Sequence, residues 1–396
     1  MSDPRAGEHG AVPRESVSFA RFVRYFLGLG TWGFGGPIAT VGYMQRDLVE
    51  RRGWLERQDF LNGVALGQTM PGPLAAQVVM WVGYLRRGAL GALATSLTFI
   101  LPSFVLVVAV AFLYVRYQGL AVVQSIFYGV APAVMAIIAF AAVKLARLTD
   151  GRDLRLWVIS GAMLAVTAFT GAEIALLFIA AGLVMVVWEA PPRSVRRLSG
   201  RGTLMLLAAA PPQFSVAMGT ATAATLLALG LFFLKAGAFI FGSGLAIVPF
   251  LREGVVVQHG WLTERQFLDA VAMGLITPGP VVITAAFIGY LVGGLIGACV
   301  ATVAIFTPIY LGVVVPGRWF IRHRDNARVR AFVKGATAAA AGAIGGATIV
   351  LTRGAVVDLR TLGILLASLI FVWQLKNKEP ILVVLAAGVG IVLKGF

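Results

Sequence analysis

Two proline–glycine–proline breaks interrupt apolar stretches of the chain and have the chemistry of an anion site. They lie at residues 71–73 and 278–280. Proline removes a backbone donor and glycine adopts conformations closed to other residues, so each break should interrupt a helix. The helix that restarts after a break has unpaired N–H groups in its first turn, and these groups and the helix dipole favour negative charge. The two breaks therefore predict two anion-binding helix ends.

A glycine-rich break precedes each of these. Residues 33–37 read GFGGP and residues 241–244 read FGSG. The apolar stretches 60–69 and 74–85 are each shorter than the roughly 20 residues needed to cross a bilayer, so we expect half-helices or re-entrant hairpins. Such backbone is tolerated at membrane depth where it is buried or lines a cavity. The candidate substrate-binding residues are Phe34, Gly35, Gly36, Pro37, Gln68, Thr69, Pro71, Gly72, Pro73, Gln77, Lys235, Phe241, Gly242, Ser243, Gly244, Thr277, Pro278, Gly279, Pro280 and Thr284.

Three charged residues near the breaks have open roles. Lys235 lies in an apolar run, where it either faces a site or extends to the membrane interface. Asp269 is a candidate for proton coupling or an ordinary member of an amphipathic half-helix, and Arg46 is a candidate for gating ion pairs. The first-half counterpart of Lys235 is Gly28 and that of Asp269 is Asn62, so we expect the halves to differ in duty.

The breaks belong to an internal duplication. Residues 53–73 and 260–280 are identical at 11 of 21 positions, at an offset of 207. Duplicated hydrophobic halves with matching breaks are typical of secondary transporters. We divide the chain into a polar tail (1–17), a first repeat (18–189), a cytoplasmic linker (190–203) and a second repeat (204–396).

Loop charges predict that the repeats are inverted. Arg86 and Arg87 correspond to the uncharged residues 292–294, whereas the arginine-poor loop 116–119 corresponds to the arginine-rich stretch 318–334. Lysine and arginine collect in cytoplasmic loops, so corresponding loops prefer opposite sides. As a cause of the inversion we expect an additional crossing at 213–234, because the aligned segment 6–27 of the first half is polar over its first part and arginine-bearing later.

Composition predicts an all-α polytopic membrane protein. The chain has 396 residues, of which 59% are hydrophobic and 13% charged, against about 25% charged in soluble domains. The formal charge of +16 fits cytoplasmic loops, and we expect no nucleic-acid partner. One cysteine, three histidines in tail or loops and the lack of a Gly-Lys pair argue against disulfides, a metal site and a nucleotide-driven motor. We expect no cofactor.

The ordered motifs resemble the chromate ion transporter family in its long-chain, two-domain form. FGGP, WL-x4-F, PGP and GY or GYLRRG occur in order, with a second set in the second half, and the resemblance covers roughly 20–190 and 215–395. It implies an ion-gradient-driven protein of the cytoplasmic membrane that exports chromate and confers resistance to it, with site elements at all four breaks and Lys235 as a counter-charge. The chain departs from the family pattern at GSG in place of GGG and at Asn62, which bear on selectivity and coupling.

Alternatives within and outside this class stay open. Chromate is a tetrahedral dianion shaped like sulfate, so a carrier of sulfate or another oxyanion is the nearest alternative, and a proton or an anion is a possible counter-substrate. An anion channel would need a pore lined by polar or charged rings. A membrane enzyme such as a chromate reductase would need a cofactor site that the sequence does not display. The sequence does not predict an oligomeric state.

Overall fold

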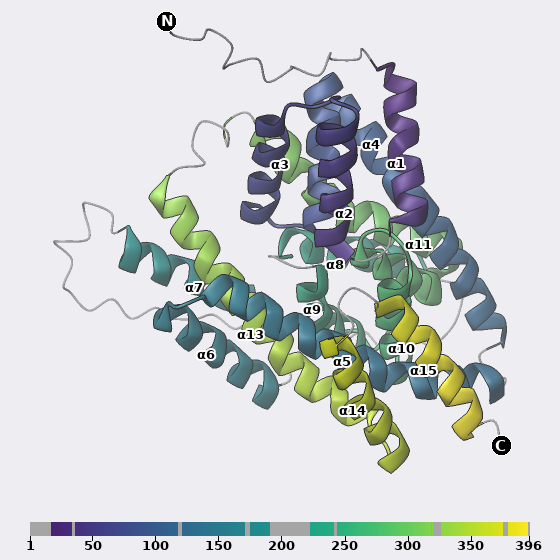
Figure 1. The fold of residues 1–396 in the computed structure, drawn as a ribbon. Helices are drawn as coiled ribbons and strands as arrows, with labels where there is room; N and C mark the ends of the chain where they lie inside the picture. Colours follow the sequence, from purple (N-terminus) through teal and green to yellow (C-terminus); the bar gives the residue numbers. More distant parts are fainter. Residues whose placement is uncertain are drawn as a thin grey trace, which may run out of the picture.

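The computed structural model describes residues 17–33, 36–117, 121–170, 175–190, 222–240, 244–317, 319, 326–374 and 379–394. These residues form helices and no strands (Figure 1). Most of the expected linker and the start of the expected crossing at 213–234 lie outside them.

The two halves have corresponding elements in the same order, and the second half adds the short 3-10 helices η3 and η5. The first half has α1 (Phe19–Trp32), α2 (Gly36–Met44), the π-helical turn η1 (Gln45–Arg51), α3 (Arg57–Thr69), α4 (Leu74–Tyr117), α5 (Ala121–Asp150), α6 (Leu154–Thr170) and α7 (Ala175–Glu189). The second half has α8 (Ala223–Ala238), η3 (Gly244–Ile247), α9 (Val248–Arg252), η4 (Glu253–Gln258), α10 (Glu264–Ile276), η5 (Val281–Ile283), α11 (Thr284–Val314), α13 (Ala327–Ala355), α14 (Leu359–Gln374) and α15 (Glu379–Lys394).

Helices α4 and α11 each fold back on themselves near their start. Gly88 has φ 58° and ψ −145°, and its counterpart Gly294 has φ 59° and ψ −150°. The Thr95 hydroxyl donates to the Val79 carbonyl at 3.0 Å, although 16 residues of straight helix would rise about 24 Å. The first part of α4 therefore returns beside the second part. With α3 it forms the expected re-entrant hairpin, whose tip is the break at 71–73.

The two halves are inverted relative to each other. The Tyr310 hydroxyl, near the end of α11, donates to the Ala89 carbonyl at the start of the long part of α4 (2.9 Å). Conversely, the Tyr114 ring near the end of α4 packs on Phe287 near the start of α11, with centroids 5.4 Å apart. Equivalent helices thus run antiparallel, as the loop charges predicted.

The expected crossing at 213–234 begins outside the described residues, and its described part belongs to α8. Helix α8 is not an addition to the second repeat, because α1 is its counterpart. Gly30 of α1 lies against a backbone carbonyl of α4, and Gly237 of α8 lies against the matching carbonyl of α11. The polar character of α1 is confined to its outer face, since Phe22 and Phe26 are fully buried on the inner face. Hydrophobicity averaged along the sequence combines the polar outer face with the apolar inner face, so it did not reveal this helix.

The halves exchange helices, so that neither is a separate packing unit. The central helix α13 packs on α6 and α7 of the first half, while α5 packs on α14 and α15 of the second half. The exchange is symmetric in detail: Gly335 touches the Ala181 carbonyl and Gly129 touches the Ala386 carbonyl. Close backbone contact at small residues is the usual mode of helix association in membranes.

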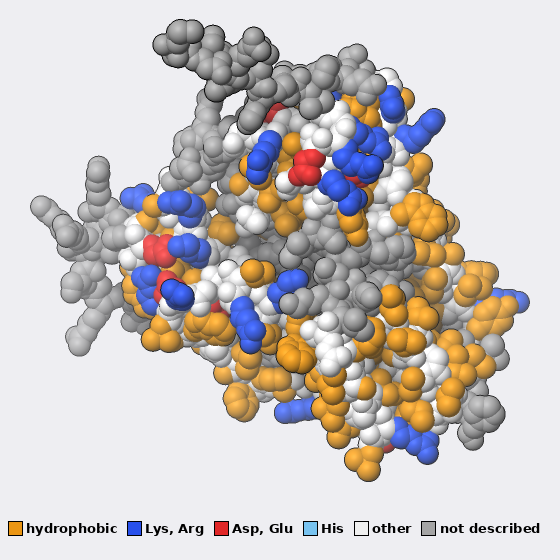
Figure 2. Space-filling model, in the orientation of Figure 1, with side chains coloured by type: hydrophobic (Ala, Val, Ile, Leu, Met, Phe, Trp, Pro, Cys, Tyr) orange, Lys and Arg blue, Asp and Glu red, His pale blue; other side chains and the backbone are white. Residues whose placement is uncertain are grey.

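The outer surface fits a bilayer. Four helices are long and apolar enough to cross a membrane, at 74–117, 124–150, 281–314 and 327–355, and further shorter apolar helices accompany them. Hydrophobic side chains cover much of the lower and right-hand surface in Figure 2. Large apolar side chains are exposed on these helices: Phe169 is 90% exposed and Trp373 is 70% exposed, which suits contact with lipid.

Candidate functional site

The two Pro-Gly-Pro breaks meet near the glycine-rich break of the second half. The Gly72 amide donates to the Ile240 carbonyl at 2.6 Å, which joins the first half to the residue before 241–244. A Cβ atom placed on Gly244 would lie 3.8 Å from the Pro73 Cβ and 3.5 Å from the Val281 Cβ. Breaks that are about 200 residues apart in the chain thus share one small volume.

Three helical segments begin at this meeting point. Helix α4 begins at Leu74, η3 begins at Gly244 and continues through α9 and η4, and η5 begins at Val281 and continues into α11. The first amide of α4 to reach a partner one turn back is that of Gln77, which donates to the Pro73 carbonyl at 3.1 Å. The amides before it point out of the helix start. Converging starts of this kind concentrate partial positive charge without a fixed cation.

Both central glycines are required by conformation and by contact. Gly72 has φ 141° and Gly279 has φ 94°, where side chains are strained. A Cβ on Gly72 would lie 2.8 Å from the Gln77 amide and 3.0 Å from the Ile309 Cγ2, and one on Gly279 would overlap the Ser103 hydroxyl. Ser103 and Ile309 are counterparts in the repeat, so the two tips have the same shape and different chemistry.

Gln77 holds the first break in shape. Its side chain is completely buried, and its Nε2 donates to the carbonyls of Met70 (3.2 Å) and Pro71 (2.9 Å). Its Oε1 is buried without a hydrogen-bond partner. The amide hydrogens that we expected to face the substrate are therefore used by the break, and the atom left over is an acceptor.

The hydroxyl groups near the second break also close on the backbone. Thr284 donates to the Val281 carbonyl at 2.8 Å, Thr277 reaches the Gly274 carbonyl at 3.5 Å, and Ser103 donates to the Pro278 carbonyl at 2.6 Å. These bonds satisfy carbonyls that the break frees. What remains to face a ligand at these residues is backbone and hydroxyl oxygen.

The other candidates of the breaks divide by what the structure describes. Helix α2 begins with Gly36 and Pro37, and Gln68 is exposed at the end of α3. The prolines and glycine of the two Pro-Gly-Pro breaks are either half-buried (Pro71 and Gly279) or buried (Pro73, Pro278 and Pro280). The described residues do not include Phe34, Gly35, Phe241, Gly242, Ser243 or the side chain of Thr69.

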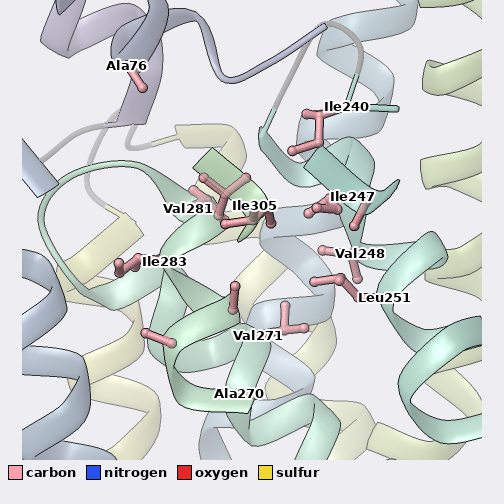
Figure 3. Close-up of a cluster of buried hydrophobic side chains, with 14 of the residues drawn as sticks. Ala76, Ile240, Ile247, Val248, Leu251, Ala270, Val271, Val281, Ile283 and Ile305 are labelled. Atoms are coloured by element: carbon pink, nitrogen blue, oxygen red, sulfur yellow. The ribbon is translucent and has the colours of Figure 1, made fainter. Parts of the chain in front are cut away.

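An apolar cluster supports the meeting point from below. Figure 3 shows Ile247, Val248 and Leu251 of η3 and α9 in the same cluster as Val281 and Ile305, and all five are buried. The cluster excludes water beneath the breaks, and low polarity strengthens electrostatic attraction to a bound charge.

Lys235 and Arg46 lie on exposed surfaces. The Lys235 ammonium is 5.8 Å from the centroid of the Phe250 ring, in the last turn of α8, where the helix dipole favours a cation. Arg46 pairs with Asp47 at 3.5 Å and lies over the Tyr43 ring at 5.5 Å. The interactions described for these two residues are with neighbours in their own half.

Asp269 is a buried carboxylate at the contact between halves. It is 2% exposed, and the Tyr114 hydroxyl of α4 donates to its Oδ2 at 2.7 Å. Its counterpart Asn62 accepts from Gln58 at 3.1 Å within the first half. The ionisable member of the pair therefore belongs to the second half alone.

Sequence reasoning missed Ser103, Ile240 and Tyr114. Ser103 follows Pro102, which matches Pro308 in the repeat, and a hydroxyl beside a repeated proline in an apolar run was a usable signal. Ile240 contributes only its carbonyl and Tyr114 acts across about 150 residues, so local patterns could not identify them.

Comparison with known proteins agrees with this architecture. A family model described as "Chromate transporter" matches residues 20–187 and again 227–392. The chain is 49% identical over 379 residues to the "Chromate transport protein" of Cupriavidus metallidurans, covering 95% of this chain and 94% of the relative. It is 47% identical over 382 residues to the "Probable chromate transport protein" of Synechococcus elongatus (95% and 96%), and 33% identical over 393 residues to the "Chromate transport protein" of Pseudomonas aeruginosa (96% and 92%).

No solved structure matches the chain. The two family matches cover both halves and fall on the two sets of equivalent helices described above. The chain therefore belongs to the chromate transporter family.

Proposed function

We propose that the protein is a secondary transporter that exports chromate across the cytoplasmic membrane and so confers resistance to it. The observation that carries the proposal is the meeting of breaks from both halves, where the Gly72 amide reaches the Ile240 carbonyl and Gly244 lies against Pro73 and Val281. Family membership and the names of the relatives support chromate as the substrate.

Helix N-termini suit a substrate that must be released from the site as well as bound there. Backbone amides and dipoles attract a tetrahedral dianion, yet they present no full charge that would hold it permanently. The acceptor Oε1 of Gln77 is the one buried polar side-chain atom at the first break with no hydrogen-bond partner among the described residues. It disfavours tight binding of an anion or selects a protonated one.

The inverted repeat provides a structural basis for alternating access to the site. Antiparallel equivalent halves exchange their conformations when the site opens to the other side, so a rocking of one half against the other alternates access. The breaks would act as hinges in this movement, because their glycines and prolines lie at the contact between the halves.

Asp269 and Tyr114 are our candidates for proton coupling. A buried carboxyl group that faces a hydroxyl across the contact between halves is the type of group that carries protons in membrane transporters. Rocking would separate the two residues, because α10 and α4 belong to different halves, and Asp269 would then exchange its proton. A counter-moving anion such as sulfate is the alternative source of drive.

Proteoliposomes loaded with protein test the proposal. Labelled chromate should move in a saturable manner, respond to a pH gradient or to internal sulfate, and show counterflow. Absence of protein-dependent chromate movement under every gradient overturns the proposal. Non-saturating flux without counterflow identifies a channel, and saturable flux of sulfate with no chromate identifies a sulfate carrier.

Variants at the tips locate the site. Gly72→Leu and Gly279→Leu should abolish flux while the protein still inserts in the membrane, because each leucine would fill the meeting point of the breaks. If both variants transport normally, the breaks are packing kinks.

A further inference from the structure

A cavity of about 530 Å³ lies in the first half, separate from the residues that meet at the Pro-Gly-Pro tips. Helix α1, the end of α2 and η1 form its walls. Its charged lining consists of Arg21, Arg24, Arg46 and Arg52 against the single acid Asp47, an excess of three positive charges (four minus one). Figure 2 shows Lys and Arg side chains gathered on the upper surface, in the region where Figure 1 places α1 and α2.

Aromatic rings hold two of these arginines in place. The Arg52 guanidinium lies 4.7 Å from the Trp54 centroid and 5.2 Å from that of Tyr25, and the Arg21 guanidinium lies 5.9 Å from Trp54. The two rings beside Arg52 restrict its side chain, and a guanidinium placed in this way suits the binding of an oxyanion through its N–H groups. Pre-positioned arginines lose less entropy when they bind than mobile ones do.

The cavity leads toward a helix break. Gly28, Leu29 and Gly33 also line it, and Gly33 is the first residue of the break at 33–37. A ligand that enters between the arginines is therefore brought to the glycine-rich break of the first half.

The second half lacks this arrangement. The counterparts of Arg21 and Arg24 are Ala228 and Leu231, and that of Arg46 is Glu253. Where the first half is hollow, the Phe232 and Phe250 rings stack at 5.5 Å.

The mirrored position of Arg52 is also neutral. It is His259, which stacks on Trp261 with centroids 4.2 Å apart, and burial lowers the pKa of its imidazole. The imidazole is therefore uncharged at neutral pH, whereas a guanidinium is always charged. The symmetry between the repeats therefore does not explain the cavity or its positive charge. Both features are specific to the first half.

We propose that this basic cavity is an antechamber that binds a tetrahedral oxyanion on the way to the helix breaks, on one side of the membrane only. The proposal rests on the proposed function for the direction of travel, and on the arginines for the ligand class. Guanidinium groups bind such anions through paired hydrogen bonds. The phosphate of an anionic lipid has the same chemistry, and we commit to the free ion.

Equilibrium binding of labelled sulfate to the full-length protein tests the antechamber without transport. In detergent micelles the wild type should bind sulfate at two sites, the helix breaks and the basic cavity. The Gly72→Leu variant should keep only the site in the basic cavity. Arg24→Gln combined with Arg52→Gln should weaken the remaining site by at least about tenfold, the effect of losing charge-assisted hydrogen bonds. The matched control is Arg57→Gln combined with Arg147→Gln, which removes the same charge from exposed arginines outside the cavity and should leave binding unchanged.

Transport provides the second readout. The Arg24 and Arg52 double variant should raise the half-saturating chromate concentration about tenfold with little change in maximal flux, and rising salt should reduce the difference. Equal effects of the control pair, or unchanged sulfate binding in the cavity variant, overturn the proposal. Loss of sulfate binding in nanodiscs rich in phosphatidylglycerol, with binding retained in micelles, assigns the cavity to lipid and overturns it as well. Sulfate binding at the arginines in a protein that moves no chromate would refute the proposed function and leave the antechamber standing.

Discussion

The contact between Gly279 and Ser103 allows a quantitative test of how the breaks are held. Gly279→Ala would place a Cβ over the Ser103 Oγ, at a residue with φ 94°. Ser103 must then rotate and give up its 2.6 Å hydrogen bond to the Pro278 carbonyl. The perturbation thus combines backbone strain, a steric overlap and a lost hydrogen bond.

Each part has a known scale. A side chain in a sparsely populated backbone region costs about 1–3 kcal/mol, and a buried carbonyl left without its donor costs about 1–3 kcal/mol. Gly279→Ala should therefore destabilise by about 2–6 kcal/mol. Ser103→Ala alone should cost about 1–3 kcal/mol. The double variant should be no less stable than Gly279→Ala, because that single variant has already lost the hydrogen bond and the second change removes the overlap.

The free energy of unfolding of each variant is measured in mixed micelles. Unfolding is titrated with a denaturing detergent and followed by tryptophan fluorescence. The double-mutant cycle should give a coupling energy of about 1–3 kcal/mol. As a control, Gly88→Ala places its Cβ in open space, so Gly88→Ala and Ser103→Ala should be additive. Additive costs for Gly279→Ala and Ser103→Ala would refute the contact and with it the described geometry of the second tip.

Further predictions concern coupling, the turned helices and the exposed lysine. Asp269→Asn copies the first-half residue Asn62, so flux should lose its response to a pH gradient while exchange of chromate for sulfate persists, as measured in proteoliposomes; unchanged gradient response would remove Asp269 from coupling. Gly88→Ala and Gly294→Ala should each reduce the unfolding free energy by about 1–3 kcal/mol through backbone strain alone, and a neutral result in the micelle titration would contradict the sharp turns of α4 and α11. Lys235→Ala should raise the half-saturating chromate concentration if the ammonium is a counter-charge, and an unchanged value would assign it to the membrane interface.

The sequence was most informative where the duplication kept physical constraints. Matching Pro-Gly-Pro breaks predicted re-entrant hairpins because proline and glycine end helices in any context, and opposite loop charges predicted antiparallel halves because membranes sort arginine by side. The turns at Gly88 and Gly294 were also readable in principle, since both fall in glycine-bearing loops at matching positions. Hydrophobic periodicity alone does not show that a helix folds back at such a loop.

Other features depend on long-range packing and had no local signal. The exchange of α6 and α7 against α14 and α15 follows from small-residue contacts between distant helices. Gln77 looked like a substrate donor, but the carbonyls released by the break use its amide first. Cavities arise from what neighbouring helices leave unfilled, so the basic cavity of the first half was visible in the sequence only as scattered arginines.

The most direct test of the central claim is a reversible disulfide across the meeting point. In a Cys299→Ser background, Pro73→Cys and Gly244→Cys would place their Cβ atoms 3.8 Å apart, within the range for a disulfide. Chromate flux into proteoliposomes is measured before oxidation, after oxidation and after reduction, with each single cysteine variant as control. Oxidation should stop flux in the double variant alone, reduction should restore it, and bound chromate should slow formation of the cross-link. Full flux through a protein whose cross-link is verified would contradict an anion path between these breaks.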